Sequence, residues 1–153
     1  GPLEDAELDR VVRALRITRA DVVAHQWCDN GPGWRGILLG SADAVLAVKP
    51  DPGLMAGMDV GIAGPRPAGD GCALEVRAFF PGNHGVAEDP VTGSLNAALA
   101  LWLVGQGLAP PEYVAAQGTV LGREGRVHVE RDAQGTTWIG GGAVTCVEGT
   151  TRI

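Results

Sequence analysis

The chain has 153 residues, a formal net charge of −6 and 24 glycines. This length suits one domain with a substantial core, and the acidic balance, without a Lys/Arg-rich stripe, argues against nucleic acid and anionic membranes as partners. Its three cysteines are odd in number and far apart. Neither a zinc site nor a disulfide framework is therefore indicated, and a reducing cytoplasm is the simplest setting.

The start of the chain and its longest apolar run further limit the expected domain bounds and location. Gly1-Pro2 resembles the scar left when a purification tag is cleaved, so we expect a single domain over residues 3–153. No signal peptide is recognisable at the start. The only long apolar run, Leu95 to Val104, is too short to cross a bilayer. We therefore expect a cytoplasmic protein with no membrane partner.

The first predicted element is an amphipathic helix with Asp5 as its N-cap. Its apolar residues recur at helical spacing: Leu8, Val11, Val12 and Leu15. The period then shortens, and Gly, Pro and Asp separate apolar runs that are typical of short strands. These strands are predicted over residues 21–28, 34–40, 44–50, 58–64 and 72–80, with a possible helical turn over residues 50–58.

The next element differs in character, because nearly every residue from Leu95 to Val104 is apolar. A helix that is apolar on all sides must be buried on all sides. Further strands are then predicted over residues 112–122, 125–131, 136–141 and 143–149, with a hairpin turn at residues 132–135. Trp138 and Cys146 are predicted to pack in the interior.

These elements predict an α+β fold. Regular βαβ alternation is missing, which argues against a doubly wound sheet. A strongly curved, barrel-like and mostly antiparallel sheet wrapped around one buried central helix would cover every side of the apolar helix.

The segment Glu88–Ala97, "EDPVTGSLNA", has two interpretations. Asp89 followed by Pro90 is a familiar helix entry, in which Asp accepts bonds from free backbone amides. However, Val91, Thr92 and Gly93 are poor residues for a first turn, so the helix is expected to start near Gly93 or Ser94. An anion could then bind the amides of those two residues, beside a carboxylate able to transfer a proton.

The longer stretch "EVRAFFPGNHGVAEDPVTGSLNAALALWL" resembles the second half of enzymes in the PhzF family (phenazine biosynthesis-like proteins). Later segments, "AAQGTVLGREGRVHVE" and "WIGGGAVTCVEG", are similar to the closing strands of that family. The resemblance covers almost the whole chain. It implies the diaminopimelate epimerase-like fold, in which two similar domains, each a curved sheet around a helix, enclose a cleft between the two helix N-termini.

The resemblance also implies a chemistry. Characterised members isomerise a dihydro-hydroxyanthranilate by moving a proton, without a metal or an organic cofactor. By position in the motif, Asp89 matches an acidic site residue. Gly93 and Ser94, with Thr92 in the same motif, match residues that hold the substrate carboxylate. His84 and Glu88 are expected as cleft neighbours, whereas the family's principal glutamate and a Gly-His pair lie in a first domain that this chain does not resemble.

The sequence is compatible with two functions. The chain is expected to be the second domain of a PhzF-like isomerase or epimerase of secondary metabolism, acting on a small carboxylated metabolite with a first domain in cis or trans. Alternatively, a second copy of the chain completes a dimer that binds a carboxylated small molecule without catalysis, for sequestration or self-resistance. Arg77 is expected to pair with a carboxylate near the cleft or to lie on the strand surface, and Trp34 to pack or to reach a ligand.

Overall fold

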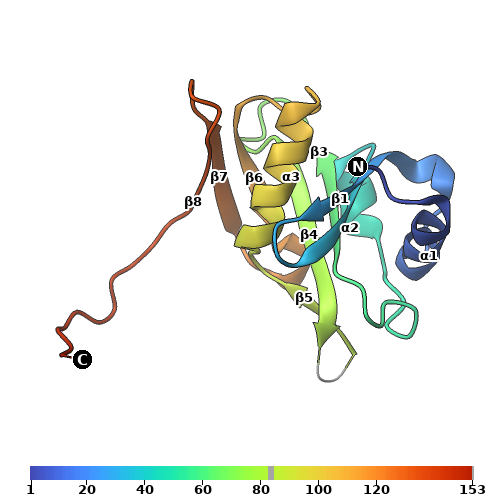
Figure 1. The fold of residues 1–153 in the computed structure, drawn as a ribbon, viewed down its shortest axis with the longest axis horizontal. Helices are drawn as coiled ribbons and strands as arrows, with labels where there is room; N and C mark the ends of the chain where they lie inside the picture. Colours follow the sequence, from blue (N-terminus) through green and yellow to red (C-terminus); the bar gives the residue numbers. More distant parts are fainter. Residues whose placement is uncertain (83–84, 153) are drawn as a thin grey trace.

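The structure, a computed structural model, describes residues 1–82 and 85–152, which form three α-helices and eight strands (Figure 1). The N-terminal half contains α1 (Asp5–Leu15), β1 (Val22–Asp29), β2 (Gly33–Leu39), α2 (Ala42–Ala47), β3 (Val60–Pro65) and β4 (Leu74–Gly82). The C-terminal half contains β5 (Gly85–Asp89), α3 (Gly93–Gly105), β6 (Glu112–Gln117), β7 (Gly125–Arg131) and β8 (Thr137–Gly140). Short 3-10 turns, η1 (Arg19–Asp21) and η2 (Thr119–Leu121), precede β1 and β7.

The strands form one mixed sheet in the order β1-β2-β3-β4-β6-β7-β8, and β5 pairs with β4 beside this path. Pairs β2–β3 and β4–β6 are parallel, and the other pairs that the structure describes are antiparallel. Parallel neighbours need a crossover connection. The connection from β2 to β3 contains α2, and the connection from β4 to β6 contains α3.

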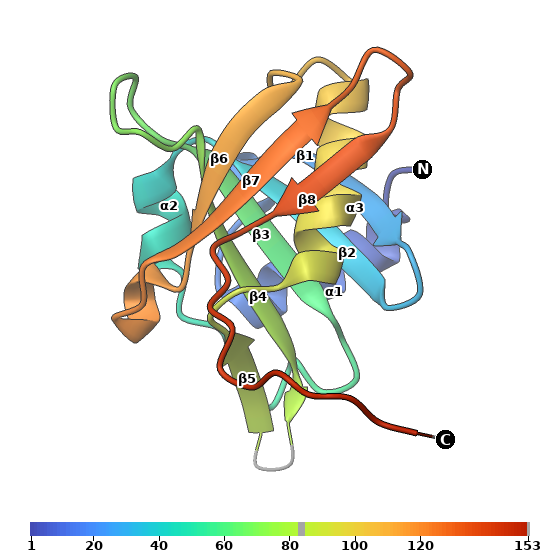
Figure 2. The same cartoon turned by 90° about the vertical axis from the view of Figure 1, so that its left-hand side faces the viewer.

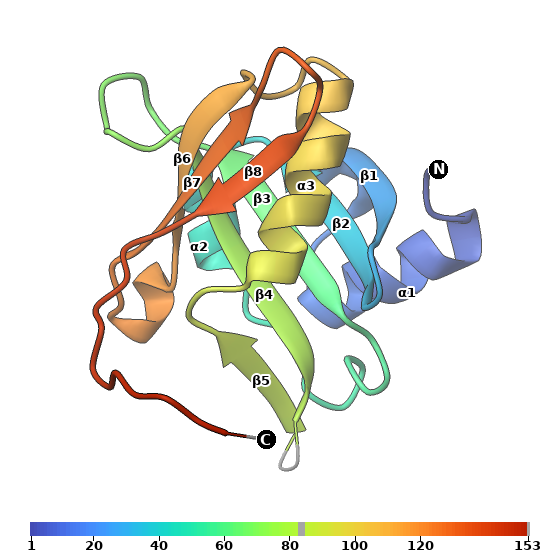
Figure 3. The ribbon, with the colours of Figure 1, turned by 60° about the vertical axis from the view of Figure 1, so that its left-hand side comes forward.

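The sheet curls around α3, as Figure 3 shows. Helix α3 contacts β1 and β2 at one end of the strand order and β7 and β8 at the other. Its residues Leu95, Leu99 and Leu103 are fully buried in a core that includes Val76 and Val127 from the sheet. The predicted α+β architecture, a curved sheet around a central helix, is therefore confirmed.

A second core lies on the other side of the sheet, under α1 and α2. Leu15 of α1 and Val45 of α2 pack there with Ile37, Ile62 and Phe79 from β2, β3 and β4. The predicted amphipathic helix is confirmed, since Leu8, Val11, Val12 and Leu15 are all buried. Its N-cap is Glu4 and not Asp5; the Asp5 carboxylate instead pairs with Arg19 at 2.8 Å.

The strand predicted over residues 44–50 is wrong, because residues 42–47 form helix α2. The Ser41 side chain accepts a hydrogen bond from the Ala44 amide at 3.1 Å and so caps the helix start. Three alanines among six residues favour a helix despite the apolar run. Residues 50–58 form turns, in which the Met55 amide donates to Asp51 O, and no helix.

Helix α3 is not buried on every side, contrary to the sequence prediction. The side chain of Leu101 is 56% exposed. It is exposed because no pairing joins β1 to β8 in the part of the chain that the structure describes. The curved sheet is therefore open along one side of α3.

The C-terminal segment also differs from its prediction. Residues 132–135 form the expected turn between β7 and β8, but residues 141–152 form neither helix nor strand and are exposed. Cys146 lies in this segment and is exposed, not buried. Trp138 is 61% exposed on β8, where its indole Nε1 donates to Asp132 Oδ2 at 2.9 Å. Within the described residues, no helix has the length and apolarity that crossing a bilayer needs.

Candidate active site at the start of helix α3

Three segments distant in sequence meet where α3 begins. Strand β5 ends at Asp89 and leads through residues 90–92 into the helix. Gln117, the last residue of β6, is hydrogen-bonded to this loop, and Asn30, in the turn between β1 and β2, is hydrogen-bonded to the first turn of α3. The start of α3 at Gly93 confirms the sequence prediction for this boundary.

Thr92 is the N-cap residue of α3, yet its hydroxyl does not cap the helix. The hydroxyl donates to Asp89 Oδ2 at 2.7 Å and accepts from Gln117 Nε2 at 2.9 Å. Asp89 and Thr92 are thus linked directly, with Thr92 buried and Asp89 half-buried. The hydroxyl is directed toward the loop and the sheet, away from the amides of the first helical turn.

Gln117 holds the loop through four hydrogen bonds and is fully buried. Its Oε1 accepts from the Thr92 amide at 3.1 Å and from Asn96 Nδ2 at 2.8 Å. Its Nε2 donates to the carbonyl oxygen of Asp89 and to the Thr92 hydroxyl, both at 2.9 Å. Buried amides are stabilising only when their polar atoms are paired, and this arrangement pairs both ends of the Gln117 amide.

The first amides of α3 find no acceptor among the residues that the structure describes. In the hydrogen bonds among described residues, Asn96 N is the first helical amide to find an acceptor, Thr92 O at 3.0 Å, and the amides of Gly93, Ser94 and Leu95 have none. Such amides carry the positive end of the helix dipole and favour an anion. A Cβ on Gly93 would meet nothing within 4 Å, so the space beside this residue is open.

Ser94 adds a side-chain donor to these amides. Trp34 Nε1 donates to Ser94 Oγ at 3.2 Å, and Asn30 Nδ2 donates to the Ser94 carbonyl at 2.9 Å. The hydroxyl hydrogen of Ser94 has no acceptor among the described residues. Trp34 therefore fixes Ser94 Oγ and leaves its O–H available to a ligand, so the interpretation of Trp34 as pure packing is incomplete.

Asp89 and its neighbour Glu88 point to opposite faces of β5, as successive strand residues do. The Glu88 carboxylate forms a bidentate pair with Arg77, with Nε–Oε1 at 2.9 Å and Nη2–Oε2 at 2.8 Å. Glu88 was expected beside the cleft, but the pair lies under α2, where Arg77 Nη1 also donates to Val45 O and Val48 O. Glu88 is thus engaged in the fold, and the predicted pairing of Arg77 with a carboxylate is present.

Two glycines let the loop approach the sheet. A Cβ on Gly118, whose φ is +87°, would lie 2.8 Å from Pro90 O. A Cβ on Gly125 would lie 2.5 Å from both Gln117 O and Val91 Cγ2. Real Cβ atoms do not make contacts this short. Gly118 and Gly125 therefore serve the packing of residues 90 and 91.

Cys28 takes no part in the site, and the prediction for His84 stays untested. His84, expected beside the cleft, lies outside the described residues. Cys28 is buried beneath Gly36, and burial raises the pKa of its thiol to about 11. It is therefore protonated at neutral pH and is not a nucleophile.

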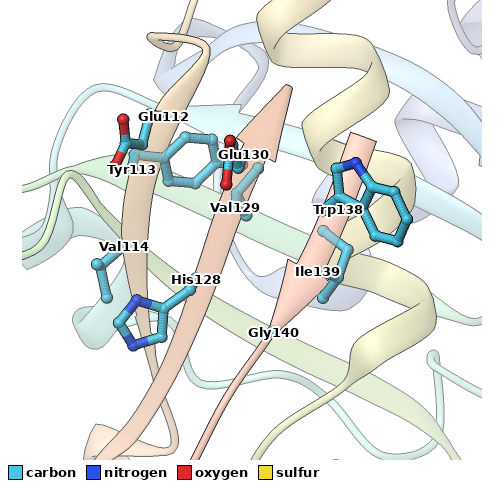
Figure 4. A pocket seen from close by; sticks show the side chains of 9 residues that line it. All are labelled: Glu112, Tyr113, Val114, His128, Val129, Glu130, Trp138, Ile139 and Gly140. Carbon is cyan, nitrogen blue, oxygen red and sulfur yellow. The ribbon is translucent and has the colours of Figure 1, made fainter. Parts of the chain in front are cut away.

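A cavity of about 680 Å³ lies elsewhere, over β6, β7 and β8 (Figure 4). Glu112 and Glu130 are cross-strand neighbours there, and Trp138 is paired with Glu130 in the next strand. Figure 2 shows these three strands side by side. None of the predicted site residues lines this cavity, so we do not place the chemistry there.

The sequence interpretation predicted Asp89, Thr92, Gly93 and Ser94, which the structure brings together at the start of α3, but it gave no role to Gln117, Asn96 or Asn30. One signal was present in the sequence for Gln117. In β6, Tyr113 and Ala115 face the core, and period-two alternation places Gln117 on the same face. A glutamine at a core position needs buried partners, and those partners are the loop before α3.

The fold and the site together define a class of protein: one lobe of a diaminopimelate epimerase-like fold, with an uncapped helix start facing outward. The sequence profile of PhzC-PhzF, described as "Phenazine biosynthesis-like protein", matches residues 3–149. The chain therefore belongs to the phenazine biosynthesis-like family.

Individual relatives agree with this assignment. The chain is 29% identical over 146 residues to the "Uncharacterized isomerase PM1503" of Pasteurella multocida, covering 94% of this chain and 50% of that protein. The PhzF-family structure from Bacillus anthracis is similar with a TM-score of 0.65 and 16% identity, covering 84% of this chain and 49% of that one.

Two other solved structures show the same fold. The Enterococcus faecalis PhzF-family protein has a TM-score of 0.63 and 21% identity, over 91% of this chain and 50% of that one. The predicted epimerase PA4716 of Pseudomonas aeruginosa has a TM-score of 0.63 and 24% identity, over 92% and 50%. The chain thus spans about half the length of the relatives it matches.

Proposed function

We propose that the chain is the second domain of a PhzF-like, cofactor-independent isomerase or epimerase that moves a proton on a small carboxylated metabolite. A first domain, in cis or in trans, supplies the other wall of the site. One observation carries the proposal: the Thr92 hydroxyl is held by Asp89 and Gln117, which leaves the first amides of α3 without a cap.

The substrate carboxylate binds at the start of α3. The free amides of Gly93 and Ser94 and the hydroxyl of Ser94 donate to its oxygens. These donors are fixed before the ligand arrives, because Trp34 and Asn30 hold Ser94. Fixed donors lose little freedom on binding, which favours both affinity and orientation.

Asp89 is the acid/base group on this wall. Its Oδ2 is occupied by Thr92, whereas Oδ1 makes no hydrogen bond with any described residue. Moving a proton between two positions of a substrate needs a group that accepts it and a group that returns one. Asp89 supplies one such group, and the family resemblance assigns the other, a glutamate, to the first domain.

Reconstitution tests this proposal. The chain is mixed with the portion of P. multocida PM1503 that it does not match, and uptake of solvent deuterium into dihydro-hydroxyanthranilate is followed by NMR. Exchange should appear only with both polypeptides. Asp89→Asn should reduce the rate roughly 10²-fold or more, as expected for loss of an acid/base group.

The matched control is Asp43→Asn, which makes the same chemical change on an exposed residue of α2. It should exchange at the wild-type rate. Undiminished exchange in Asp89→Asn would remove Asp89 from the mechanism. Carboxylate binding by the chain alone, with no exchange after the first domain is added, would instead favour the alternative of a binding module.

A further inference from the structure

The side chains before α3 form a hydrogen-bond network in which the direction of each bond can be assigned. The network runs from Asn96 through Gln117 and Thr92 to Asp89. Asn96, Gln117 and Thr92 are buried, so water has little access to their polar atoms. Hydrogen positions in amide and hydroxyl groups follow from the partners of those groups. Here some partners are backbone groups, which can only donate or only accept.

These backbone partners allow one orientation for each of the two side-chain amides. Asn96 Nδ2 lies 2.8 Å from the carbonyl oxygen of Thr92, which can only accept, so this atom belongs to the NH2 group. The Thr92 amide, which can only donate, lies 3.1 Å from Gln117 Oε1, and Asn96 Nδ2 donates to the same oxygen at 2.8 Å. Turning either amide by 180° would place donor against donor or acceptor against acceptor.

The orientation of Gln117 decides where the hydroxyl hydrogen of Thr92 points. Gln117 Nε2 donates one hydrogen to the carbonyl oxygen of Asp89 and the other to Thr92 Oγ1, each at 2.9 Å. Thr92 Oγ1 therefore accepts from Gln117, and its own hydrogen is donated to Asp89 Oδ2 at 2.7 Å. No other acceptor for this hydrogen is found among the described residues.

This direction makes the two carboxylate oxygens of Asp89 unequal. A proton on Oδ2 would oppose the Thr92 hydrogen and leave a buried hydroxyl donor without an acceptor, which is unfavourable. Oδ1 makes no hydrogen bond with any described residue. It can therefore gain or lose a proton without disturbing the network.

We propose that Gln117 is a positioning residue that directs the Thr92 hydrogen onto Asp89 Oδ2 and so reserves Oδ1 for proton transfer. The inference rests on the proposed function, because it concerns the acid/base group of that site. A proton that Asp89 takes from a substrate C–H bond forms the O–H bond at Oδ1, and a proton that it returns leaves from Oδ1. Oδ2 keeps its hydrogen bond from Thr92 in both states.

Three substitutions test the two bonds that carry the proposal. Thr92→Val keeps the side-chain shape and removes the hydroxyl, and Thr92→Ser restores the hydroxyl. Gln117→Glu replaces the NH2 donor by an oxygen, toward which the Thr92 hydroxyl would turn. Thr136→Val, in the exposed turn before β8, is the matched control. Uptake of solvent deuterium is measured with the unmatched portion of P. multocida PM1503, and each rate is divided by the folded fraction from circular dichroism.

We expect the effect on kcat and not on KM, because the network orients the acid/base group and does not hold the substrate carboxylate. Thr92→Val and Gln117→Glu should lower kcat about tenfold or more and leave KM within about twofold of wild type. Thr92→Ser should recover most of the lost kcat. Thr136→Val should match wild type in both constants.

NMR of the isolated wild-type chain shows the direction of the Thr92 bond without catalysis and without any variant that has to fold. The hydroxyl hydrogen of Thr92 should be visible in water, because a buried, hydrogen-bonded hydrogen exchanges slowly. Replacing it by deuterium should shift the carboxyl carbon resonance of Asp89. That shift should disappear in Gln117→Glu.

The outcomes separate the inference from the function on which it rests. Wild-type kcat in Thr92→Val, or a Thr92 hydrogen whose replacement leaves the Asp89 carbon unchanged, overturns the inference while the proposed function stands. A raised KM with an unchanged kcat would make Thr92 a binding group and would also overturn the inference. Absence of exchange with the wild-type chain contradicts the proposed function, and the inference with it.

Discussion

Two buried polar clusters flank the end of β5, and they differ in what they leave free. The first joins Glu88 to Arg77 beneath α2. All four of its strongest contacts are internal, because Arg77 Nη1 also donates to Val45 O and Val48 O. The second joins Asp89 to Thr92 and Gln117 at the start of α3. Adjacent carboxylates in the sequence thus belong to different parts of the molecule.

On our proposal, the difference separates a structural cluster from a functional one. In the Arg77–Glu88 cluster, charge and hydrogen-bonding capacity are used up within the fold. In the Asp89–Thr92–Gln117 cluster, every interior atom is paired, but three helix amides and one carboxylate oxygen remain unpaired among described residues. Substitutions in the first cluster should therefore affect stability, and substitutions facing outward from the second should affect ligand binding and catalysis.

The largest expected effect is that of Arg77→Ala. It leaves the Glu88 charge largely buried without its partner and removes one donor each from Val45 O and Val48 O at the end of α2, and breaking such a pair typically costs about 3–5 kcal/mol. Urea unfolding followed by circular dichroism measures this loss. The double variant Arg77→Met, Glu88→Leu removes both charges and should recover much of the stability. If Arg77→Ala lowers the free energy of unfolding by no more than the double variant does, the Arg77–Glu88 pair does not stabilise the fold as proposed.

The next effect compares Glu88→Gln with Asp89→Asn, the same chemical change on neighbouring residues. Glu88→Gln leaves the Arg77 charge without its counter-charge and should lower the free energy of unfolding by about 2–4 kcal/mol. Asp89→Asn keeps an oxygen for the Thr92 hydroxyl and should change it by less than about 1 kcal/mol. Urea unfolding of both variants measures the two changes in the free energy of unfolding. Equal decreases would contradict the difference between the two clusters.

A somewhat smaller loss is expected for Gln117→Met, which keeps the side-chain size and removes all four hydrogen bonds. Unsatisfied groups at Thr92 and Asn96 should lower the free energy of unfolding by about 2–3 kcal/mol in total. Carboxylate binding should weaken as well, because the loop before α3 loses its support. Gln134→Met, on an exposed turn, is the control and should change stability by less than about 0.5 kcal/mol.

The smallest stability change is expected for Gly93→Ala. A Cβ at this position meets nothing within 4 Å, so the free energy of unfolding should stay within about 1 kcal/mol of wild type or rise. The same methyl group would occupy the space in which a carboxylate approaches the helix amides. Thermal unfolding measures the stability of Gly93→Ala, and ligand titration measures its carboxylate affinity. Unimpaired binding would show that the carboxylate does not bind beside Gly93.

The sequence predicted the local parts of this site and missed the long-range parts. Asp89, Thr92, Gly93 and Ser94 are consecutive or nearly so, and their capping chemistry can be derived without knowing the fold. Gln117 is 28 residues from Asp89, and Trp34 is 60 residues from Ser94. Those contacts follow from the β4–β6 pairing and the curl of the sheet around α3, which no local pattern specifies.

The errors of fold prediction have similar physical causes. Residues 42–47 are apolar and short, and such runs suit helix or strand equally by periodicity; the Ser41 cap decides for a helix. The apolar α3 was expected to be enclosed, but a sheet that ends at β1 and β8 leaves Leu101 open. Residues 143–149 have a strand sequence but pair with no strand that the structure describes, and strand propensity alone does not form a strand without a neighbouring edge.

The central claim is that the start of α3 is a carboxylate site, and one titration tests it most directly. The isolated ¹⁵N-labelled chain is titrated with benzoate, and the amide shifts are followed in wild type and in Gly93→Ala. We expect the largest shifts on the amides of Gly93, Ser94 and Leu95, and we expect Gly93→Ala to remove them while the fold persists. Shifts that centre on the cavity over β6, β7 and β8, or that survive in Gly93→Ala, would contradict it.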